Sequence, residues 1–128
     1  MRIAMMTNNY KPFVGGVPIS IERLADSLRD LGHSVYVFAP DYKSPVDDDE
    51  YTFRFPTMKH KIAGAIPIPN LIYGYVKNAI STLDIDLIHV HHPVMIGNVA
   101  TRIGKEFHIP VVLSLIHISE PTRPISIS

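Results

Sequence analysis

The chain has 128 residues, with 12 basic and 12 acidic side chains, no cysteine and 46% apolar residues. This length and composition indicate one globular domain and exclude a disordered or collagen-like chain. The balanced charge gives no field that would attract nucleic acid, the missing cysteines exclude a disulfide framework, and no stretch approaches the roughly 18 apolar residues of a membrane span. We therefore expect a soluble cytoplasmic domain.

The first forty residues predict a strand, a helix and a second strand. Residues 2–7 form a short, nearly continuous apolar run, typical of a strand covered on both faces of a parallel sheet. Apolar residues then recur every three or four positions, which predicts a helix with Pro18 in its first turn and Gly32 as its left-handed C-cap. Residues 34–39, SVYVFA, predict the second strand. The predicted buried stripe of the helix consists of Ile21, Leu24, Ala25, Leu28 and Leu31.

The middle of the chain is less regular. The run DDDE at 47–50 is interpreted as a solvated loop and not a metal site, because consecutive carboxylates in a loop seldom converge without further ligands. The alternating segment 51–55 predicts a third strand, and the prolines around residues 57–70 predict an irregular connection. A second helix is predicted over residues 71–83. Its predicted buried stripe consists of Leu71, Ile72, Tyr75, Val76, Ala79, Ile80 and Leu83.

The last elements complete an alternating pattern. The segment DLIHVHHP predicts a fourth strand that ends near His91, residues 94–107 predict a third helix, and IPVVLS opens a fifth strand. Strands that alternate with helices in this way predict an α/β fold with a Rossmann-like, doubly wound and mainly parallel sheet. The functional edge of such a sheet lies at the carboxyl ends of its strands.

Two glycines, Gly15 and Gly16, stand between the first predicted strand and the first helix. Free backbone N–H groups at a helix N-terminus favour an anion, and glycine lets a phosphate approach the main chain. Neither a G-x-G-x-x-G pattern nor a P-loop is present, so the pair is not a dinucleotide or nucleotide fingerprint. A tight turn that requires positive φ explains the two glycines equally well.

Three histidines, His89, His91 and His92, mark the end of the fourth predicted strand. In a strand, His89 and His91 share a face and His92 points away, so the three cannot ligate one metal ion without a break in the strand. We interpret them as a polar wall of a ligand cleft at the sheet edge and expect no metal. No Ser-His-Asp or Cys-His arrangement can be assembled from the sequence.

A basic cluster lies beside the apolar stretch that contains Tyr73 and Tyr75. Such a composition can rest on an anionic lipid surface. The alternative is a basic loop that leads into a core-packed helix, because the buried stripe of the second helix already needs those apolar residues. The cluster consists of Lys59, His60, Lys61 and Lys77.

Three motifs resemble the N-terminal domain of the family 4 retaining glycosyltransferases, which have the two-domain GT-B architecture. They are Y-x-P-x-x-G-G-V at 10–17, L-x-x-x-G-H-x-V-x-V at 28–37 and D-[LI]-I-H-x-H-x-P at 86–93. The resemblance covers residues 1–112 and is strongest to the diacylglycerol and phosphatidylinositol glycosyltransferases. It implies transfer of a hexosyl group from a nucleotide-sugar donor with retention and without a cofactor. It also makes a membrane lipid a candidate acceptor, with peripheral contact at the inner face of the membrane.

The same resemblance assigns roles to residues of this sequence. It places the donor diphosphate near Gly15 and Gly16, and it gives His91 and His92 the facing edge of the cleft. Tyr10, Lys11 and Pro12 shape the glycine loop. The family's His-Thr pair after the fifth strand is not matched by residues 115–117, so His117 receives no role and the catalytic residues stay unassigned.

The end of the chain departs from the family pattern. Residues 113–123, LSLIHISEPTR, resemble the translation of a transposase adapter end used in preparing sequencing libraries. We expect residues 113–128 to be a non-native or disordered tail, the C-terminal donor-binding domain to be absent, and this fragment to be inactive alone. Two other functions stay open: a non-catalytic nucleotide- or sugar-phosphate-binding module that uses the Gly15–Gly16 turn, and a flavodoxin-like regulatory domain.

Overall fold

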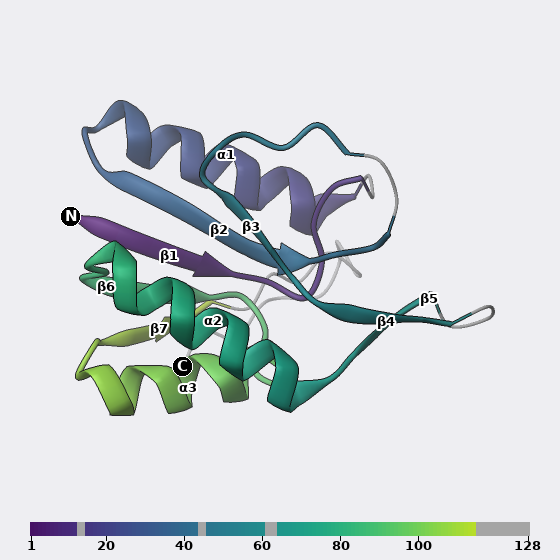
Figure 1. Cartoon of the computed structure of the whole chain (residues 1–128). Helices are drawn as coiled ribbons and strands as arrows, with labels where there is room; N and C mark the ends of the chain where they lie inside the picture. The colour runs from purple at the N-terminus through teal and green to yellow at the C-terminus, as the bar shows by residue number, and fades with distance from the viewer. Residues whose placement is uncertain (13–14, 44–45, 61–63, 115–128) are drawn as a thin grey trace, which may run out of the picture.

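The computed structural model of the chain describes residues 1–12, 15–43, 46–60 and 64–114. Five parallel strands form one sheet in the order β3-β2-β1-β6-β7 (Figure 1). The predicted Rossmann-like α/β sheet is therefore confirmed. Its strands are β1 (Arg2–Met6), β2 (Ser34–Pro40), β3 (Thr52–Phe55), β6 (Leu87–Val90) and β7 (Val111–Leu113).

The segment after β3 is a hairpin and not the irregular connection that the prolines predicted. Strands β4 (Thr57–His60) and β5 (Gly64–Pro67) pair antiparallel beside the carboxyl edge of the main sheet (Figure 1). The prolines stand at the ends of elements: Pro56 separates β3 from β4, Pro67 is the last residue of β5, and Pro69 begins the next helix. Proline therefore marks the ends of these elements without preventing them.

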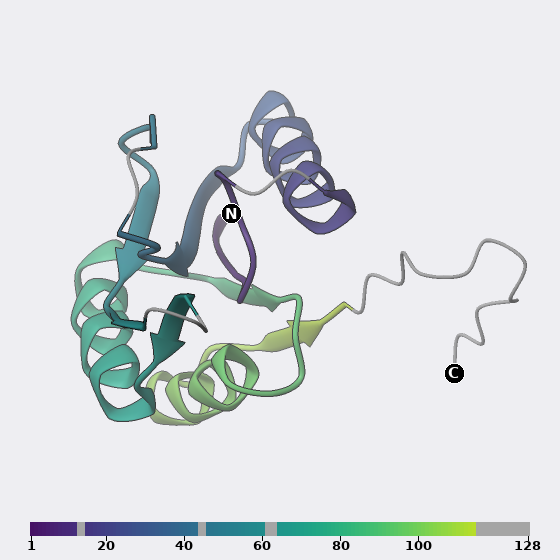
Figure 2. The same ribbon diagram turned by 90° about the vertical axis from the view of Figure 1, so that its right-hand side faces the viewer.

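Three helices cover the two faces of the sheet (Figures 1 and 2). Helix α1 (Gly16–Asp30) lies on one face, and α2 (Pro69–Leu83) and α3 (Ile96–Phe107) lie on the other. In β1, Ile3 and Met5 belong to the cluster with α1, whereas Ala4 and Met6 belong to the cluster with α2 and α3. Because successive side chains point to opposite faces, a strand covered on both sides is apolar throughout.

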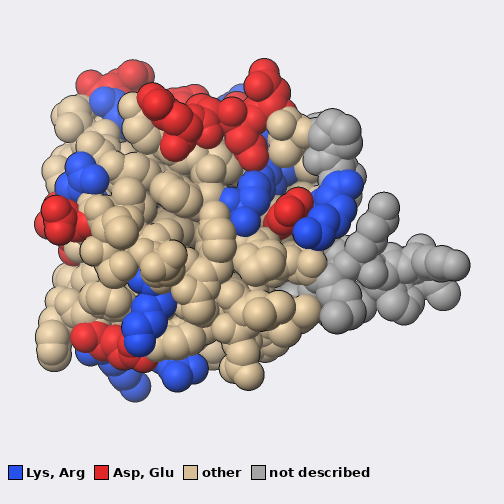
Figure 3. All heavy atoms as spheres, viewed as in Figure 1, with Lys and Arg blue, Asp and Glu red and all other residues tan. Residues whose placement is uncertain are grey.

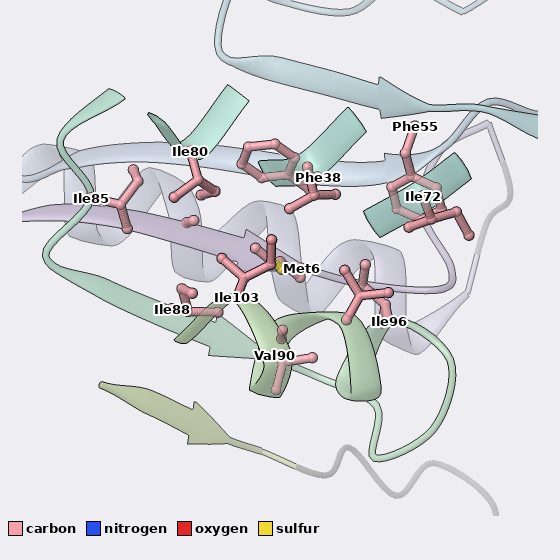
Figure 4. Close-up of a cluster of buried hydrophobic side chains, with 14 of the residues drawn as sticks. Met6, Phe38, Phe55, Ile72, Ile80, Ile85, Ile88, Val90, Ile96 and Ile103 are labelled. Carbon is pink, nitrogen blue, oxygen red and sulfur yellow. The ribbon is translucent and has the colours of Figure 1, made fainter. Parts of the chain in front are cut away.

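The larger core lies between the sheet and the α2–α3 pair (Figure 4). Phe38 of β2 stacks on Phe53 of β3 with ring centroids 5.0 Å apart. Helix α2 presents Ile72, Val76 and Ile80 to this core, at a spacing of four residues. This packing leaves the carboxyl ends of the strands, on the right in Figure 1, for the loops that follow them.

The buried stripes of the helices are narrower than predicted. Helix α1 buries Ile21 and Ala25, but Leu24 and Leu31 are exposed, the latter to 74%. Leu24 is exposed because a lone helix on one face of the sheet contacts it along one line of residues only. Leu31 is exposed because it follows the last residue of the helix. Leu71 of α2 is likewise exposed, because it lies beside the line of residues that points to the core. The predicted left-handed Gly32 is confirmed by its φ of 95°.

Candidate functional site

The sheet changes its winding direction between β1 and β6. From β1 the chain passes through α1 to β2, and from β6 it passes through α3 to β7 on the other side. Since α1 and α3 cover opposite faces, the loops after β1 and β6 diverge at the carboxyl edge of two paired strands. Open α/β sheets bind ligands in the crevice at such a switch point.

All six predicted site residues follow these two strands. Four of them lie in the stretch after β1, which includes the start of α1, and two lie in the loop after β6. The structure therefore brings the predicted residues to one edge of the sheet. They are Tyr10, Lys11, Gly15 and Gly16 after β1, and His91 and His92 after β6.

Tyr10 is a buried anchor of the first loop. Its backbone N–H donates to the Tyr42 hydroxyl over 3.1 Å, and the Arg54 guanidinium lies 5.4 Å from the centre of its ring. Burial raises the pKa of Tyr10 to about 12, and the charges of Glu22 and Asp49 act in the same direction. Tyr10 therefore stays neutral, and its contacts with Tyr42 and Arg54 fix the position of the loop.

Lys11 carries positive charge beside the start of α1. Its Nζ lies 3.2 Å from a carboxylate oxygen of Glu22 and 5.7 Å from the centre of the Tyr10 ring. Lys11, Pro12 and Ile19 belong to the lining of a depression of about 270 Å³ between the loop and the outer side of α1. A phosphate at this place would compete with Glu22 for the lysine.

The two glycines do not form the turn with positive φ that was the alternative explanation. Gly15 has extended backbone, with φ 175° and ψ −179°, which any residue can adopt, and Gly16 is the first residue of α1. A Cβ added at Gly15 would meet nothing within 4 Å, so the space beside it is open. No side chain caps the helix at Gly15. The free amides at a helix N-terminus are in general suited to bind an anion.

The three histidines lie as the strand period predicts. The rings of His89 and His91 have centroids 4.4 Å apart on one face, and Nε2 of His92 lies 3.1 Å from the Thr7 hydroxyl oxygen in the other loop. Nε2 of His89 lies 2.8 Å from the Ser114 hydroxyl oxygen. His91 is only 3% exposed, and neither ring nitrogen has a hydrogen-bond partner within the described ranges.

Burial keeps this histidine wall uncharged. It lowers the pKa of His91 to about 4, to which the neighbouring His89 and His92 contribute, and it lowers the pKa of His89 and His92 as well. A neutral imidazole offers one donor and one acceptor, which suits a hydroxyl group. The edge therefore combines uncharged imidazoles in and after β6 with the Lys11–Glu22 ion pair and the N-terminus of α1.

At least one residue of each of the other two charged motifs forms an ion pair. Asp48, from the acidic run, makes two contacts of 2.8 Å with the guanidinium of Arg54. Lys77, from the basic cluster, pairs with Glu106 of α3 at 3.1 Å. Lys61 lies outside the described residues. On the face shown in Figure 3, many acidic side chains lie along the upper rim, and others lie beside basic side chains elsewhere on this face.

The described part of the chain shows neither a metal-binding cluster nor a membrane-spanning helix. It holds no group of three or more His, Asp or Glu side chains placed to bind a metal ion. None of its helices has the length and apolar character needed to cross a bilayer. Leu113 ends β7 and the Ser114 amide donates to Val90, whereas residues 115–128, including His117, lie outside the described ranges.

Sequence reasoning missed the polar residues that hold the two loops together. Thr7 is buried, and its hydroxyl donates to the Asn9 carbonyl at 2.8 Å in addition to contacting His92. Asn8 makes hydrogen bonds to Val94 and Ile96 in the loop after β6. Their signal was the same as for the histidines: polar side chains directly after a buried strand.

The chain resembles known glycosyltransferases. The model of Glycosyltransferase Family 4 matches residues 14–123. An alpha-monoglucosyldiacylglycerol synthase from Acholeplasma laidlawii is 29% identical over 118 residues, which cover 90% of this chain and 29% of that protein. A GDP-mannose-dependent alpha-mannosyltransferase from Mycolicibacterium smegmatis is 31% identical over 122 residues, which cover 88% of this chain and 31% of that protein.

The fold has relatives among solved structures. The structure of MurG from Acinetobacter baumannii aligns with a TM-score of 0.63 at 14% identity, over 89% of this chain and 34% of that one. At this identity the likeness shows the fold alone. The chain spans about a third of the length of the relatives it matches.

Proposed function

Since the chain belongs to glycosyltransferase family 4, we propose that it forms one wall of a site that transfers a hexosyl group from a nucleotide sugar to an acceptor, with retention of configuration. The observation that carries the proposal is the switch point between β1 and β6. Two of the three motifs that resemble the family, at residues 10–17 and 86–93, reach the two loops that diverge from these paired strands. Open α/β sheets bind their ligands at such a switch point.

The two halves of the edge suit the two partners of the reaction. The uncharged imidazole of the half-buried His92 is suited to an acceptor hydroxyl group, whereas His91 is too buried to meet one directly. The amides at Gly15 and Gly16, with Lys11 beside them, are suited to the diphosphate of the donor. Stabilisation of the departing diphosphate is the main electrostatic demand of such a reaction.

We further propose that residues 1–112 are the family's N-terminal domain and that the donor-binding domain lies outside this chain. Donor and acceptor then meet between two domains, and one wall can neither exclude water nor orient both partners. The chain alone is expected to bind ligands weakly and not to turn over.

We propose a lipid acceptor at the inner, cytoplasmic face of a membrane. The support is the Acholeplasma relative, whose name describes the synthesis of a glucosylated diacylglycerol. Contact with the bilayer would bring such an acceptor to the edge of the sheet without a membrane-spanning helix.

Two binding experiments on this chain test the proposal. The first measures co-sedimentation with phosphatidylcholine vesicles that contain or lack diacylglycerol, and the second is calorimetry with GDP-mannose and UDP-glucose. We expect diacylglycerol-dependent binding that His92→Ala weakens, no effect of His33→Ala at the opposite edge, and no measurable heat from the nucleotide sugars. Tight nucleotide-sugar binding without vesicle binding would instead identify a non-catalytic module.

A further inference from the structure

Asn8 connects three strand ends at the switch point. Its side-chain Nδ2 donates to the Val94 carbonyl at 3.1 Å, and its Oδ1 accepts from the Ile96 N–H at 3.3 Å. Its backbone carbonyl accepts from the Tyr42 hydroxyl, after β2, at 3.3 Å. One residue after β1 therefore contacts the segments that follow both neighbouring strands.

The start of α3 depends on this contact from outside its own loop. The residue before the helix, Met95, makes no capping hydrogen bond with its side chain, and its backbone has φ 59° and ψ −97°. A non-glycine residue keeps such a conformation only where its surroundings hold it there. The side chain that accepts from the first helical amide belongs to Asn8.

The turn between β6 and α3 is also tightly wound. A Cβ added to Gly97 would overlap the carbonyl oxygen of His92, so a larger residue would force this turn to shift. At its beginning, the turn is tied to β1 because the His91 N–H donates to the Met6 carbonyl at 3.0 Å. At its end, Asn8 ties it to the loop after β1. The positions of His91 and His92 are therefore fixed from both sides.

We propose that Asn8 is a positioning residue of the ligand site, which sets the separation between the glycine loop and the His91–His92 turn. The inference rests on the proposed function, because it assumes that both loops face one ligand. Asparagine suits this place since its amide offers a donor and an acceptor together. Alanine offers neither, and aspartate offers only acceptors.

Aspartate separates positioning from simple helix capping. In Asn8→Asp, the carboxylate still accepts from Ile96, and the helix N-terminus favours its charge, so α3 stays capped. The donor to Val94 is lost, however, and two oxygens face each other there. If Asn8 were only a cap, Asn8→Asp would bind ligand like the wild type. If Asn8 sets the separation of the loops, Asn8→Asp binds as poorly as Asn8→Ala.

The experiment compares ¹⁵N–¹H spectra of the wild type, Asn8→Ala and Asn8→Asp, with phosphatidylcholine bicelles that contain or lack dioctanoylglycerol as the probe. We expect the affinity for diacylglycerol to fall about tenfold or more in both variants, because small misplacements of a binding group are costly. The amides of residues 91–97 should shift in both. Asn78→Asp, at an exposed position of α2, makes the same change of charge away from the site and should bind diacylglycerol like the wild type.

The outcomes separate this inference from the proposed function. Wild-type affinity in Asn8→Asp would overturn the positioning role and leave the function intact. If the wild type itself does not bind the probe, the proposed lipid acceptor fails. The ligand-free spectra then decide: amide exchange in residues 7–12 and 91–97 should rise together in Asn8→Asp, and unchanged exchange would overturn the inference.

Discussion

At the scale of single residues, Gly97 shows how closely α3 approaches the turn before it. A methyl group added there would overlap the His92 carbonyl. We expect Gly97→Ala to lower the free energy of unfolding by about 1–3 kcal/mol, as overpacking typically does. Urea denaturation measures this.

The matched control is Gly74→Ala at an exposed position of α2, where an added Cβ meets nothing within 4 Å. Alanine should raise the stability there by roughly 0.4–1 kcal/mol, because it restricts the unfolded chain and suits a helix. Equal effects of the two substitutions would show that the close contact at His92 is not present in solution.

His91 makes stability depend on pH. Burial lowers its pKa from the ordinary 6.5 to about 4, so between these values the unfolded chain binds a proton that the folded chain does not. Its contribution to the free energy of unfolding is therefore complete above about pH 6.5 and decreases as the pH falls towards 4.

His91→Gln should flatten this acid-side slope in urea denaturation. The slope should not vanish, because the lowered pKa values of His89 and His92 act with the same sign. His108→Asn, at an exposed position, serves as the control. Identical pH profiles for wild type and His91→Gln would contradict the burial of this imidazole.

At the scale of elements, α1 holds the sheet through few side chains. Ile21 is fully buried, and Leu31 is largely exposed after the helix ends. We expect Ile21→Ala to cost about 2–5 kcal/mol, as large-to-small changes in a core do. Leu31→Ala should change the stability by less than about 0.5 kcal/mol. If thermal or urea unfolding showed similar losses of stability in the two variants, Leu31 would belong to the buried stripe after all.

Local sequence patterns predicted the strands of the main sheet and the helices that cover it. Apolar runs located β1 and β2, and spacings of three and four located the helices. The hairpin β4–β5 was missed because prolines at the ends of elements look like prolines in a loop. The width of a helix stripe depends on what the helix packs against, which no local pattern contains.

The site was predictable to the same extent. The strand period placed His89 and His91 on one face, and the rule for parallel sheets brought the two loops to one edge. The role of Asn8 was not predictable, because its partners Val94 and Ile96 are more than eighty positions away. The extended backbone of Gly15 was not predictable either, since glycine permits many conformations.

At the scale of the whole molecule, β7 is one of the two edge strands of the described five-stranded sheet. Val112 and Leu113 are 46% and 49% exposed. An apolar edge strand invites pairing with another chain. We expect association that increases with concentration in sedimentation velocity and decreases in Val112→Lys. A monodisperse wild type that melts cooperatively would count against it.

Photoaffinity labelling can show whether the ligand site lies between the loops after β1 and β6. The chain is irradiated with a diazirine-bearing diacylglycerol in vesicles, digested with trypsin and analysed by mass spectrometry. The label should fall on peptides 3–23 and 78–102, which contain the two loops. Peptide 30–43 is not informative, because it contains Tyr42, which contacts the first loop. Label confined to peptide 24–29, in the second half of α1, would contradict this placement of the site.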